Sequence, residues 1–247
     1  MSYIIIGASS GLGRELSYTF GINKKNLLLV SRDKRDLVPL KIDLEEKYKI
    51  SVKIIDFDFS KIEEIKSELI SQIDNKEDIK GILFPIGLMH EKDNIDLPLE
   101  DLIKLYYANF ISIVFTISEI RKIIKNKDFL FVGFGSVSGL LGRDLNANYA
   151  AAKRALESFF ESLAFDSIRS SYNVHFYTLG YMQTNLAFGK NLKLPKGNVK
   201  ALANLVYKSK KHKSVKKYFP FYWNIVAIVL KLVPFKFILS FKKLLKS

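Results

Sequence analysis

The residues with the clearest potential for chemistry are a tyrosine and a lysine four positions apart, Tyr149 and Lys153. In a helix this spacing puts both side chains on one face, one turn from each other. The ammonium of Lys153 then lies near the phenol of Tyr149 and favours its ionised form, so that the phenol can give or take a proton near neutral pH. Because chance produces many such pairs, their weight depends on what the rest of the chain places around them.

A glycine-rich turn follows the apolar run Tyr3–Ile6 and opens a helical pattern. Glycines let the backbone approach a pyrophosphate, and a helix N-terminus offers free N–H groups and positive potential. The spacing is G-x-x-x-G-x-G, not the more general G-x-G-x-x-G, and a tight turn without a ligand is the alternative. We expect a dinucleotide-phosphate site made of Gly7, Ser9, Ser10, Gly11, Leu12 and Gly13.

The end of the next apolar run bears on the choice of cofactor. An acid there would bind the ribose hydroxyls of NAD. Ser31 holds the position of that acid, and the guanidinium of Arg32 can pair bidentately with a 2′-phosphate. The residues therefore favour NADP(H), with NAD(H) as the alternative because Asp33 follows directly.

Length and composition fit one α/β domain. The chain has 247 residues, 48% of them hydrophobic and 26% charged, as in a globular protein with a sizeable core. The absence of cysteine excludes disulfides, thiolate metal sites and cysteine nucleophiles. No metal site is expected, since His90, His175 and His212 show no metal-ligand spacing.

Short apolar runs alternate with helical patterns, which predicts a single doubly wound parallel sheet of about seven strands with helices on both faces. The expected strands are Tyr3–Ile6, Asn26–Ser31, Ser51–Asp58, Gly81–Ile86, Phe129–Phe134, Asn173–Leu179 and Ser214–Phe219. The expected helices are Gly11–Phe20, Asp33–Lys49, a segment capped by Ser60 that reaches about Ile73, one or two helices over Leu99–Lys125, Ala147–Arg169 and Val199–Lys210.

These motifs, in this order, resemble those of the short-chain dehydrogenase/reductase family over about residues 3–184. The glycine motif of the family matches the turn at Gly7, and its tyrosine and lysine match Tyr149 and Lys153. Further matches are the serine thirteen residues before the tyrosine, the helical asparagine, the acid near the adenine, and the threonine at the nicotinamide carboxamide four residues after a glycine: Ser136, Asn109, Asp58, Thr184 and Gly180.

Three departures from the family pattern stand out. Ile6 replaces a threonine, Phe84-Pro85-Ile86-Gly87 replaces an Asn-Asn-Ala-Gly motif, and Leu179 replaces the proline of a Pro-Gly pair. The second departure removes polar side chains that brace the sheet and the adenosine side. It predicts weaker cofactor affinity and unchanged proton-transfer groups.

The resemblance implies hydride transfer between a nicotinamide and a carbonyl or alcohol carbon. In reduction Tyr149 would donate the proton to the developing alkoxide, and Ser136 would hydrogen-bond the same oxygen. Lys153 would lower the pKa of the tyrosine and bind the nicotinamide ribose, while Asn109 would anchor a water that relays protons.

Each of these residues also has a purely structural interpretation. Ser136 is a possible strand-end cap, with Ser138 as the rival hydroxyl, Asn109 a possible helix-kink residue and Tyr149 a possible packing aromatic. A catalytically inactive NADP-binding regulator is the non-enzyme alternative, against which the intact Ser-Tyr-Lys-Asn set argues.

Charge is unevenly distributed along the chain. The net charge is +14, but all 25 acidic residues lie at or before Asp166, and 16 of the 39 Lys and Arg residues follow it. Residues 1–166 therefore carry −2 and residues 167–247 carry +16. This asymmetry favours an anionic partner, unless it reflects a lysine-rich composition alone.

The end of the chain combines this charge with apolar runs, of which Phe219–Leu230 is the longest. No run there reaches the ~20 residues of a spanning helix. We expect two short helices, broken near Pro234, that lie in a membrane interface and meet anionic headgroups through lysines. A subunit interface and a cover over the substrate pocket are the alternatives. The boundary predicted is a catalytic domain over residues 1–219 and an amphipathic extension over residues 220–247.

The expected function is an NADP(H)-dependent oxidoreductase for a lipid-borne substrate. The extension resembles that of family members that reduce keto-sugars attached to polyprenyl phosphate; a long-chain keto-lipid and a small soluble ketone are the other substrates considered. No signal peptide is evident, which favours a cytoplasmic protein, peripheral at the inner face of the membrane. The family resemblance implies a homodimer or homotetramer, and no nucleic-acid partner is expected.

Overall fold

The computed structural model describes residues 2–74, 79–124, 128–142, 144–183 and 195–244. Seven strands in these residues form one sheet in the order β3-β2-β1-β4-β5-β6-β7, and every neighbouring pair is parallel. This confirms the predicted fold class. The strands are β1 (Ser2–Ile6), β2 (Asn26–Ser31), β3 (Val52–Asp56), β4 (Ile79–Phe84), β5 (Phe129–Ser136), β6 (Tyr172–Leu179) and β7 (Ser214–Phe219).

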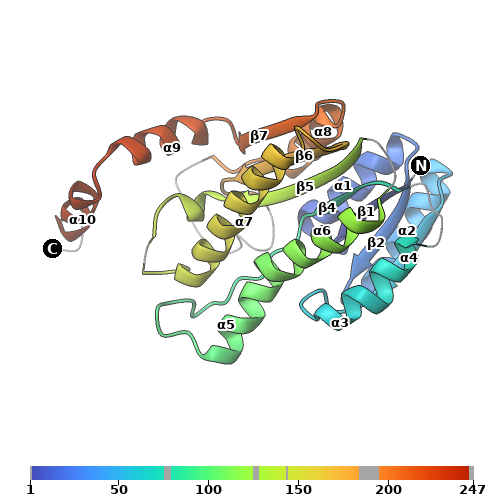
Figure 1. Cartoon of the computed structure of the whole chain (residues 1–247), viewed down its shortest axis with the longest axis horizontal. Coiled ribbons are helices and arrows are strands. Elements are labelled where there is room, and N and C mark those ends of the chain that lie inside the picture. The colour runs from blue at the N-terminus through green and yellow to red at the C-terminus, as the bar shows by residue number, and fades with distance from the viewer. Residues whose placement is uncertain (1, 75–78, 125–127, 143, 184–194, 245–247) are drawn as a thin grey trace.

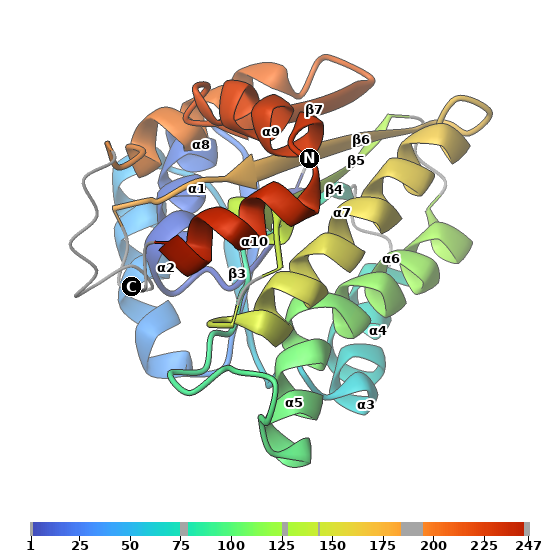
Figure 2. The ribbon, with the colours of Figure 1, turned by 90° about the vertical axis from the view of Figure 1, so that its left-hand side faces the viewer.

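Helices cover both faces of the sheet (Figures 1 and 2). One face carries α1 (Gly11–Ile22), α2 (Lys34–Tyr48) and α8 (Val199–Ser209). The other carries α3 (Ile62–Glu64), the π-helical η1 (Ile65–Ile70), α4 (Ser71–Asp74), α5 (Leu99–Tyr106), the π-helical η2 (Tyr107–Ile111), α6 (Ser112–Ile123) and α7 (Ala147–Asp166). The sheet is therefore the middle layer of three.

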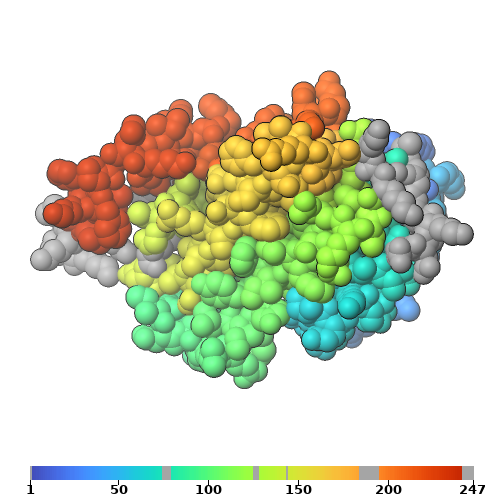
Figure 3. Space-filling model, in the orientation of Figure 1, coloured from blue at the N-terminus to red at the C-terminus, as the bar shows by residue number. Residues whose placement is uncertain are grey.

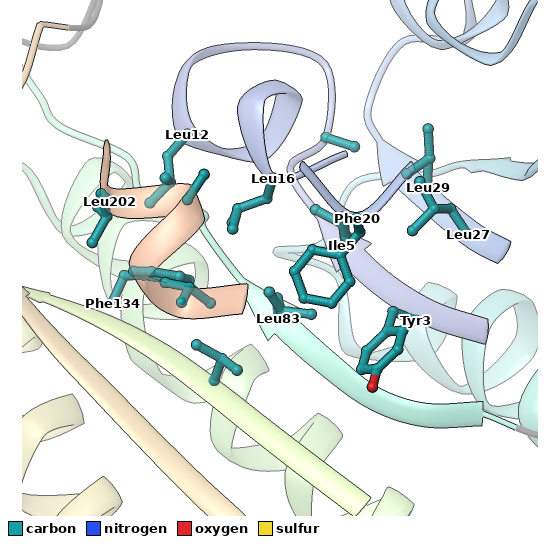
Figure 4. Packing of buried hydrophobic residues seen from close by; sticks show 14 of the residues in the cluster. Tyr3, Ile5, Leu12, Leu16, Phe20, Leu27, Leu29, Leu83, Phe134 and Leu202 are labelled. Carbon is teal, nitrogen blue, oxygen red and sulfur yellow. The ribbon is translucent and has the colours of Figure 1, made fainter. Parts of the chain in front are cut away.

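The strands are apolar on both sides because both faces are covered. In β1, Ile5 packs in the core beneath α1, α2 and α8, whereas its neighbours Ile4 and Ile6 pack in the core on the opposite face. Figure 4 shows Leu16 and Phe20 of α1 close to Ile5. The alternation of side chains along a strand thus builds two hydrophobic cores from one continuous apolar run.

Several expected ends differ from the structure by two or three residues: β3 ends at Asp56, β5 at Ser136 and α7 at Asp166. The fourth strand begins at Ile79 and ends at Phe84, because Pro85 has no N–H to continue the ladder. Ser60 does not cap the helix that follows: Lys61 occupies the cap position without a side-chain cap bond. Ser60 instead donates its backbone N–H and its hydroxyl to the Asp58 carboxylate, as short polar side chains commonly do in turns.

The run from α5 through η2 to α6 is a continuous helical segment, Leu99–Ile123. By length and composition alone it is apolar enough to cross a membrane, with 44% of its most apolar window buried. Its buried side, including Ile113, Ile117 and Ile120, packs in the core against the sheet. We therefore describe it as a core helix of the domain.

The chain ends in two further helices, α9 (Trp223–Leu232) and α10 (Phe235–Leu244), separated near Pro234 as expected. They form an arm at one end of the molecule (Figure 3). α9 contacts β7 and the short 3₁₀ helix η3 (Val137–Leu140). Trp223 and Ala227 are buried by these contacts, whereas Leu232 is 77% exposed and Phe237 is 68% exposed.

Candidate active site

A cleft of about 630 Å³ opens at the carboxyl ends of the central strands. Consecutive strands diverge there, since β1 lies between β2 and β4, and ligands of doubly wound folds bind at such a switch point. The cleft gathers most of the predicted site residues that the structure describes: Gly7, Ser9, Ser10, Gly11, Leu12, Ser31, Arg32, Asp58, Ser136, Tyr149, Lys153 and Gly180. Thr184 lies outside the described residues.

The glycine turn has the backbone that its sequence requires. Gly7 (φ +83°) and Gly11 (φ +50°) adopt left-handed conformations that favour glycine. A Cβ atom on Gly13 would lie 2.0 Å from the Gly7 carbonyl oxygen, so Gly13 lets α1 pack tightly on the turn. Ser10 makes no side-chain cap bond to α1. The first N–H groups of this helix therefore have no side-chain cap from Ser10, and N–H groups at a helix start suit a phosphate group.

The two charged residues after β2, Arg32 and Asp33, have different surroundings. Arg32 is exposed at the cleft. Asp33 accepts hydrogen bonds from the backbone N–H of Arg35 (2.8 Å) and from its guanidinium (Nε, 3.0 Å), so it caps α2. The hydrogen bonds with Arg35 lower the pKa of Asp33 to about 2. The Asp33 carboxylate is therefore bonded to Arg35 at the start of α2, whereas Arg32 lines the cleft.

Asp58 lies at the same end of the cleft and keeps its charge. Burial on its own raises the pKa of this carboxyl group, but the hydrogen bonds from Ser60 and the charge of Arg32 outweigh that effect and lower the pKa below its ordinary value. The ionised carboxylate orders the loop after β3 through the Ser60 backbone N–H, at 3.0 Å.

Tyr149 and Lys153 lie one turn apart on α7, with Lys153 Nζ 5.8 Å from the centre of the Tyr149 ring. Lys153 is buried and donates to the carbonyl oxygens of Ile86 (3.1 Å) and Phe134 (3.3 Å). Burial lowers its pKa to about 8. The ammonium is thus still mostly protonated at pH 7 and supplies a fixed positive charge beside the phenol.

Asn109 lies directly behind the cleft, in the π-helical turn η2, and is fully buried. Its Nδ2 atom donates to the carbonyl oxygens of Leu88 (2.8 Å) and Leu105 (2.9 Å), and its Oδ1 atom accepts from the Leu88 N–H (3.2 Å). A Cβ on Gly87 would lie 3.4 Å from Asn109 Oδ1 and 3.6 Å from Lys153 Nζ. The amide thus supports the π-helical turn and faces the same backbone position as the lysine.

Ser136 is the last residue of β5, and its Oγ atom accepts hydrogen bonds from the backbone N–H (3.2 Å) and the hydroxyl (2.7 Å) of Ser138. Ser136 therefore both caps η3 and lines the cleft. Ser138 also lines the cleft but is more deeply buried.

Some groups at the site were not predicted. Backbone carbonyls, not side chains, hold Lys153, and the Ile86 carbonyl belongs to the segment that replaces the family's Asn-Asn-Ala-Gly motif. Asp93 bonds to the backbone of Tyr149. Trp223 packs on Gly180 so closely that a Cβ there would lie 1.9 Å from the indole nitrogen, so α9 packs against a residue that lines the cleft. None of these contacts leaves a side-chain motif in the sequence.

A glycine turn at the switch point of a doubly wound sheet, facing a serine, a tyrosine and a buried lysine, defines a dinucleotide-dependent oxidoreductase fold. The sequence model described as short chain dehydrogenase matches residues 2–194. The chain belongs to this family of dehydrogenases and reductases, as its motifs predicted.

Curated relatives are identical to this chain at about a quarter of the aligned positions. The very-long-chain 3-oxoacyl-CoA reductase of Kluyveromyces lactis is 28% identical over 74% of this chain and 55% of the relative. The protein of the same name from Coprinopsis cinerea is 24% identical over 65% of this chain and 48% of the relative. The chain thus spans about half the length of these relatives.

Solved structures share the fold across nearly the whole chain. A short-chain dehydrogenase from Sphingobium yanoikuyae in complex with NADPH has a TM-score of 0.82 at 18% identity, covering 93% of both chains. A bulky-bulky ketone specific alcohol dehydrogenase from Comamonas testosteroni has a TM-score of 0.81 at 18% identity, covering 94% of both chains.

Proposed function

We propose that this protein is an NADP(H)-dependent oxidoreductase that interconverts a carbonyl group and an alcohol. The observation that carries the proposal is the convergence of Ser136, Tyr149 and the buried Lys153 in one cleft with the open N-terminus of α1. The turn Gly7–Gly13 would hold the pyrophosphate, and Arg32 would pair with the 2′-phosphate. When bound, NADPH supplies the hydride.

The side chains of this chain handle the proton. In reduction Tyr149 gives its phenolic proton to the developing alkoxide. The Ser136 hydroxyl hydrogen-bonds the same oxygen and stabilises its charge. The Lys153 ammonium, held by two carbonyls, keeps the phenol acidic. Asn109 and Lys153 both face Gly87, which suits a proton relay through a water molecule between them.

NADP(H) is favoured over NAD(H) by the two residues after β2. Arg32 offers a guanidinium at the cleft, and Asp33, the possible ribose ligand, is bonded to Arg35. Two similar folds support this choice: the dehydrogenases from Sphingobium yanoikuyae and Burkholderia cenocepacia are described as complexes with NADPH and NADP.

For the substrate we propose a carbonyl compound with a long apolar chain. The similarity to very-long-chain 3-oxoacyl-CoA reductases supports this class. A polyprenyl-phosphate-linked keto-sugar has the same apolar character, and a small soluble ketone remains the contrasting candidate. A screen with NADPH that compares these three classes tests the proposal. Tight NADPH binding without turnover of any of them would instead identify an inactive regulator.

The arm of α9 and α10 supports delivery from a membrane surface. Cationic Lys231 and Lys236 lie exposed on it among large apolar side chains, which are Ile225, Ile228, Val229, Leu232, Phe235, Phe237 and Leu239. A helix of this kind lies in the interface of an anionic bilayer. Because α9 packs on Gly180, a bilayer in contact with the arm would lie next to the cleft.

Liposome flotation with the full chain tests this part of the proposal. Ile228→Asp combined with Leu232→Asp removes two exposed apolar side chains from α9, and Ile22→Asp makes one such change at an exposed position on α1. We expect the wild type and Ile22→Asp to float with anionic vesicles and the α9 variant to stay in solution. Equal flotation of all three proteins would contradict membrane binding. If instead the wild type were a dimer and the α9 variant a monomer, the apolar face of α9 would be assigned to contact with a second copy of the chain.

A further inference from the structure

The catalytic helix α7 begins in an unusual way. Its cap residue, Asn146, has left-handed backbone angles (φ 59°, ψ 37°) and makes no side-chain cap bond. The first N–H groups of a helix need acceptors from elsewhere. In α7 the acceptor is the carboxylate of Asp93, which precedes Tyr149 by 56 residues.

Asp93 is almost completely buried (2% exposed) and is bonded through both carboxylate oxygens. Oδ1 accepts from the backbone N–H (3.0 Å) and the side-chain amide (2.9 Å) of Asn148, and Oδ2 accepts from the backbone N–H of Tyr149 (2.8 Å). The main chain of Asp93 is fixed as well, because its carbonyl accepts from the Asn146 N–H at 2.8 Å. The positive end of the helix dipole favours a carboxylate at this place.

The segment that carries Asp93 also touches two other groups of the site. The Ile86 carbonyl accepts from Lys153, and the backbone of Leu88 bonds in both directions to Asn109. The connection between β4 and α5 therefore makes hydrogen bonds to Lys153, Asn109 and the backbone of Tyr149. Within this connection, Asp93 is the residue that bonds to the start of the helix that carries the phenol.

We infer that Asp93 is a positioning residue for proton transfer: by holding the N-terminal turn of α7, it sets the distance of the Tyr149 phenol from Lys153 and from the reacting oxygen. The inference rests on the proposed function, because Tyr149 is there the proton donor. Misplacement by about 1 Å costs on the order of 10²-fold in rate, so a loosened first turn would lower kcat without removing any reacting group.

Two substitutions separate position from charge. Asp93→Glu keeps the charge and moves the carboxylate by a methylene, and Asp93→Asn keeps the size and removes one acceptor. Asn198→Ala is the matched control, because Asn198 Oδ1 caps α8 through the Ala201 N–H (2.9 Å). It removes one helix cap on the opposite face of the sheet.

The measurements are kcat, KM, NADPH affinity by fluorescence, and the melting temperature. We expect both Asp93 variants to lose kcat on the order of 10²-fold with NADPH affinity unchanged, and Asn198→Ala to lower the melting temperature and leave kcat as it is. If the Asp93 variants keep the kcat of the control, or change KM alone, Asp93 only stabilises the fold and the inference is wrong.

A second readout needs no substrate and so separates this inference from the proposed function. The titration of the Tyr149 phenol is read from the ultraviolet difference between a protein and its Tyr149→Phe counterpart. In Asp93→Glu we expect the phenol pKa to rise, because the phenol moves away from the Lys153 ammonium. An unchanged phenol pKa in this variant would overturn the inference even if no carbonyl substrate were turned over.

Discussion

The Nζ atom of Lys153 lies 5.8 Å from the centre of the Tyr149 ring, one helical turn along α7. Two carbonyl oxygens, of Ile86 and Phe134, hold the ammonium in a buried position. The arrangement places a fixed cation beside a phenol, and a positive charge at this place favours the ionised form of the phenol. The burial of this cation has a measurable cost.

Lys153 makes the stability of the cofactor-free protein depend on pH. Burial lowers its pKa from 10.5 to about 8, so between these values the unfolded chain binds more protons than the folded one, and stability rises with pH. The free energy of unfolding rises by about 3 kcal/mol across this window. Lys153→Met has no titrating group at this position, so this rise is absent from it. We expect the difference in unfolding free energy between the two proteins, from urea titrations, to change by this amount between pH 7.5 and 10.5.

Parallel stability curves for the wild type and Lys153→Met would show that the ammonium is not buried as described. Other lysines titrate in the same window, but they are common to both proteins and cancel in the difference.

Arg32 should decide the choice between the two nicotinamide cofactors. Arg32→Ala removes a charge-assisted pair with the 2′-phosphate, so we expect NADPH affinity to fall roughly 10- to 100-fold and NADH affinity to stay the same. Arg169→Ala, a loss of one positive charge just beyond α7, serves as the control and should alter neither dissociation constant. A matching loss for both cofactors in Arg32→Ala would mean that Arg32 does not contact the 2′-phosphate.

His175 should limit stability in acid. It lies fully buried in β6, where its Nε2 atom bonds to the His212 carbonyl at 2.8 Å. Burial lowers its pKa from 6.5 to about 4, so the unfolded chain binds the extra proton between these values. The wild type then loses about 3 kcal/mol of stability as pH falls from 6.5 to 4.

His175→Gln keeps a side-chain N–H donor and does not titrate. We expect its unfolding free energy to fall less steeply with acid than that of the wild type. The same slope in both proteins would assign the acid sensitivity to carboxyl groups alone.

The layers of the fold and much of the cleft could be predicted because their signals are local. Each strand is a short apolar run between polar turns. The spacing of the glycines after the first strand indicates a tight strand–helix turn, in which glycine is needed for positive φ at Gly7 and for close packing at Gly13. The predicted membership in the short-chain dehydrogenase family, shown by the match to residues 2–194, follows from the same local motifs.

Contacts between distant segments could not be predicted. The helix-cap bonds of Asp93 join positions up to 56 residues apart. In the sequence, nothing distinguishes this aspartate from other aspartates in polar loops. Asn109, in the π-helical turn, bonds to the backbone of Leu88, 21 residues earlier. The Ser60 cap was predicted wrongly because Lys61 holds the cap position and Ser60 bonds to Asp58, two residues earlier. In each case the role of the side chain is decided by its hydrogen-bond partner, which the residue type alone does not reveal.

The most direct test of the proposed mechanism is turnover of Tyr149→Phe, measured beside its NADPH affinity. Removing the phenolic proton donor should lower kcat roughly 10²–10⁴-fold. NADPH should bind as in the wild type, because the ring, Lys153 and the glycine turn remain. A kcat equal to that of the wild type, with NADPH bound, would contradict the assignment of Tyr149 as the proton donor.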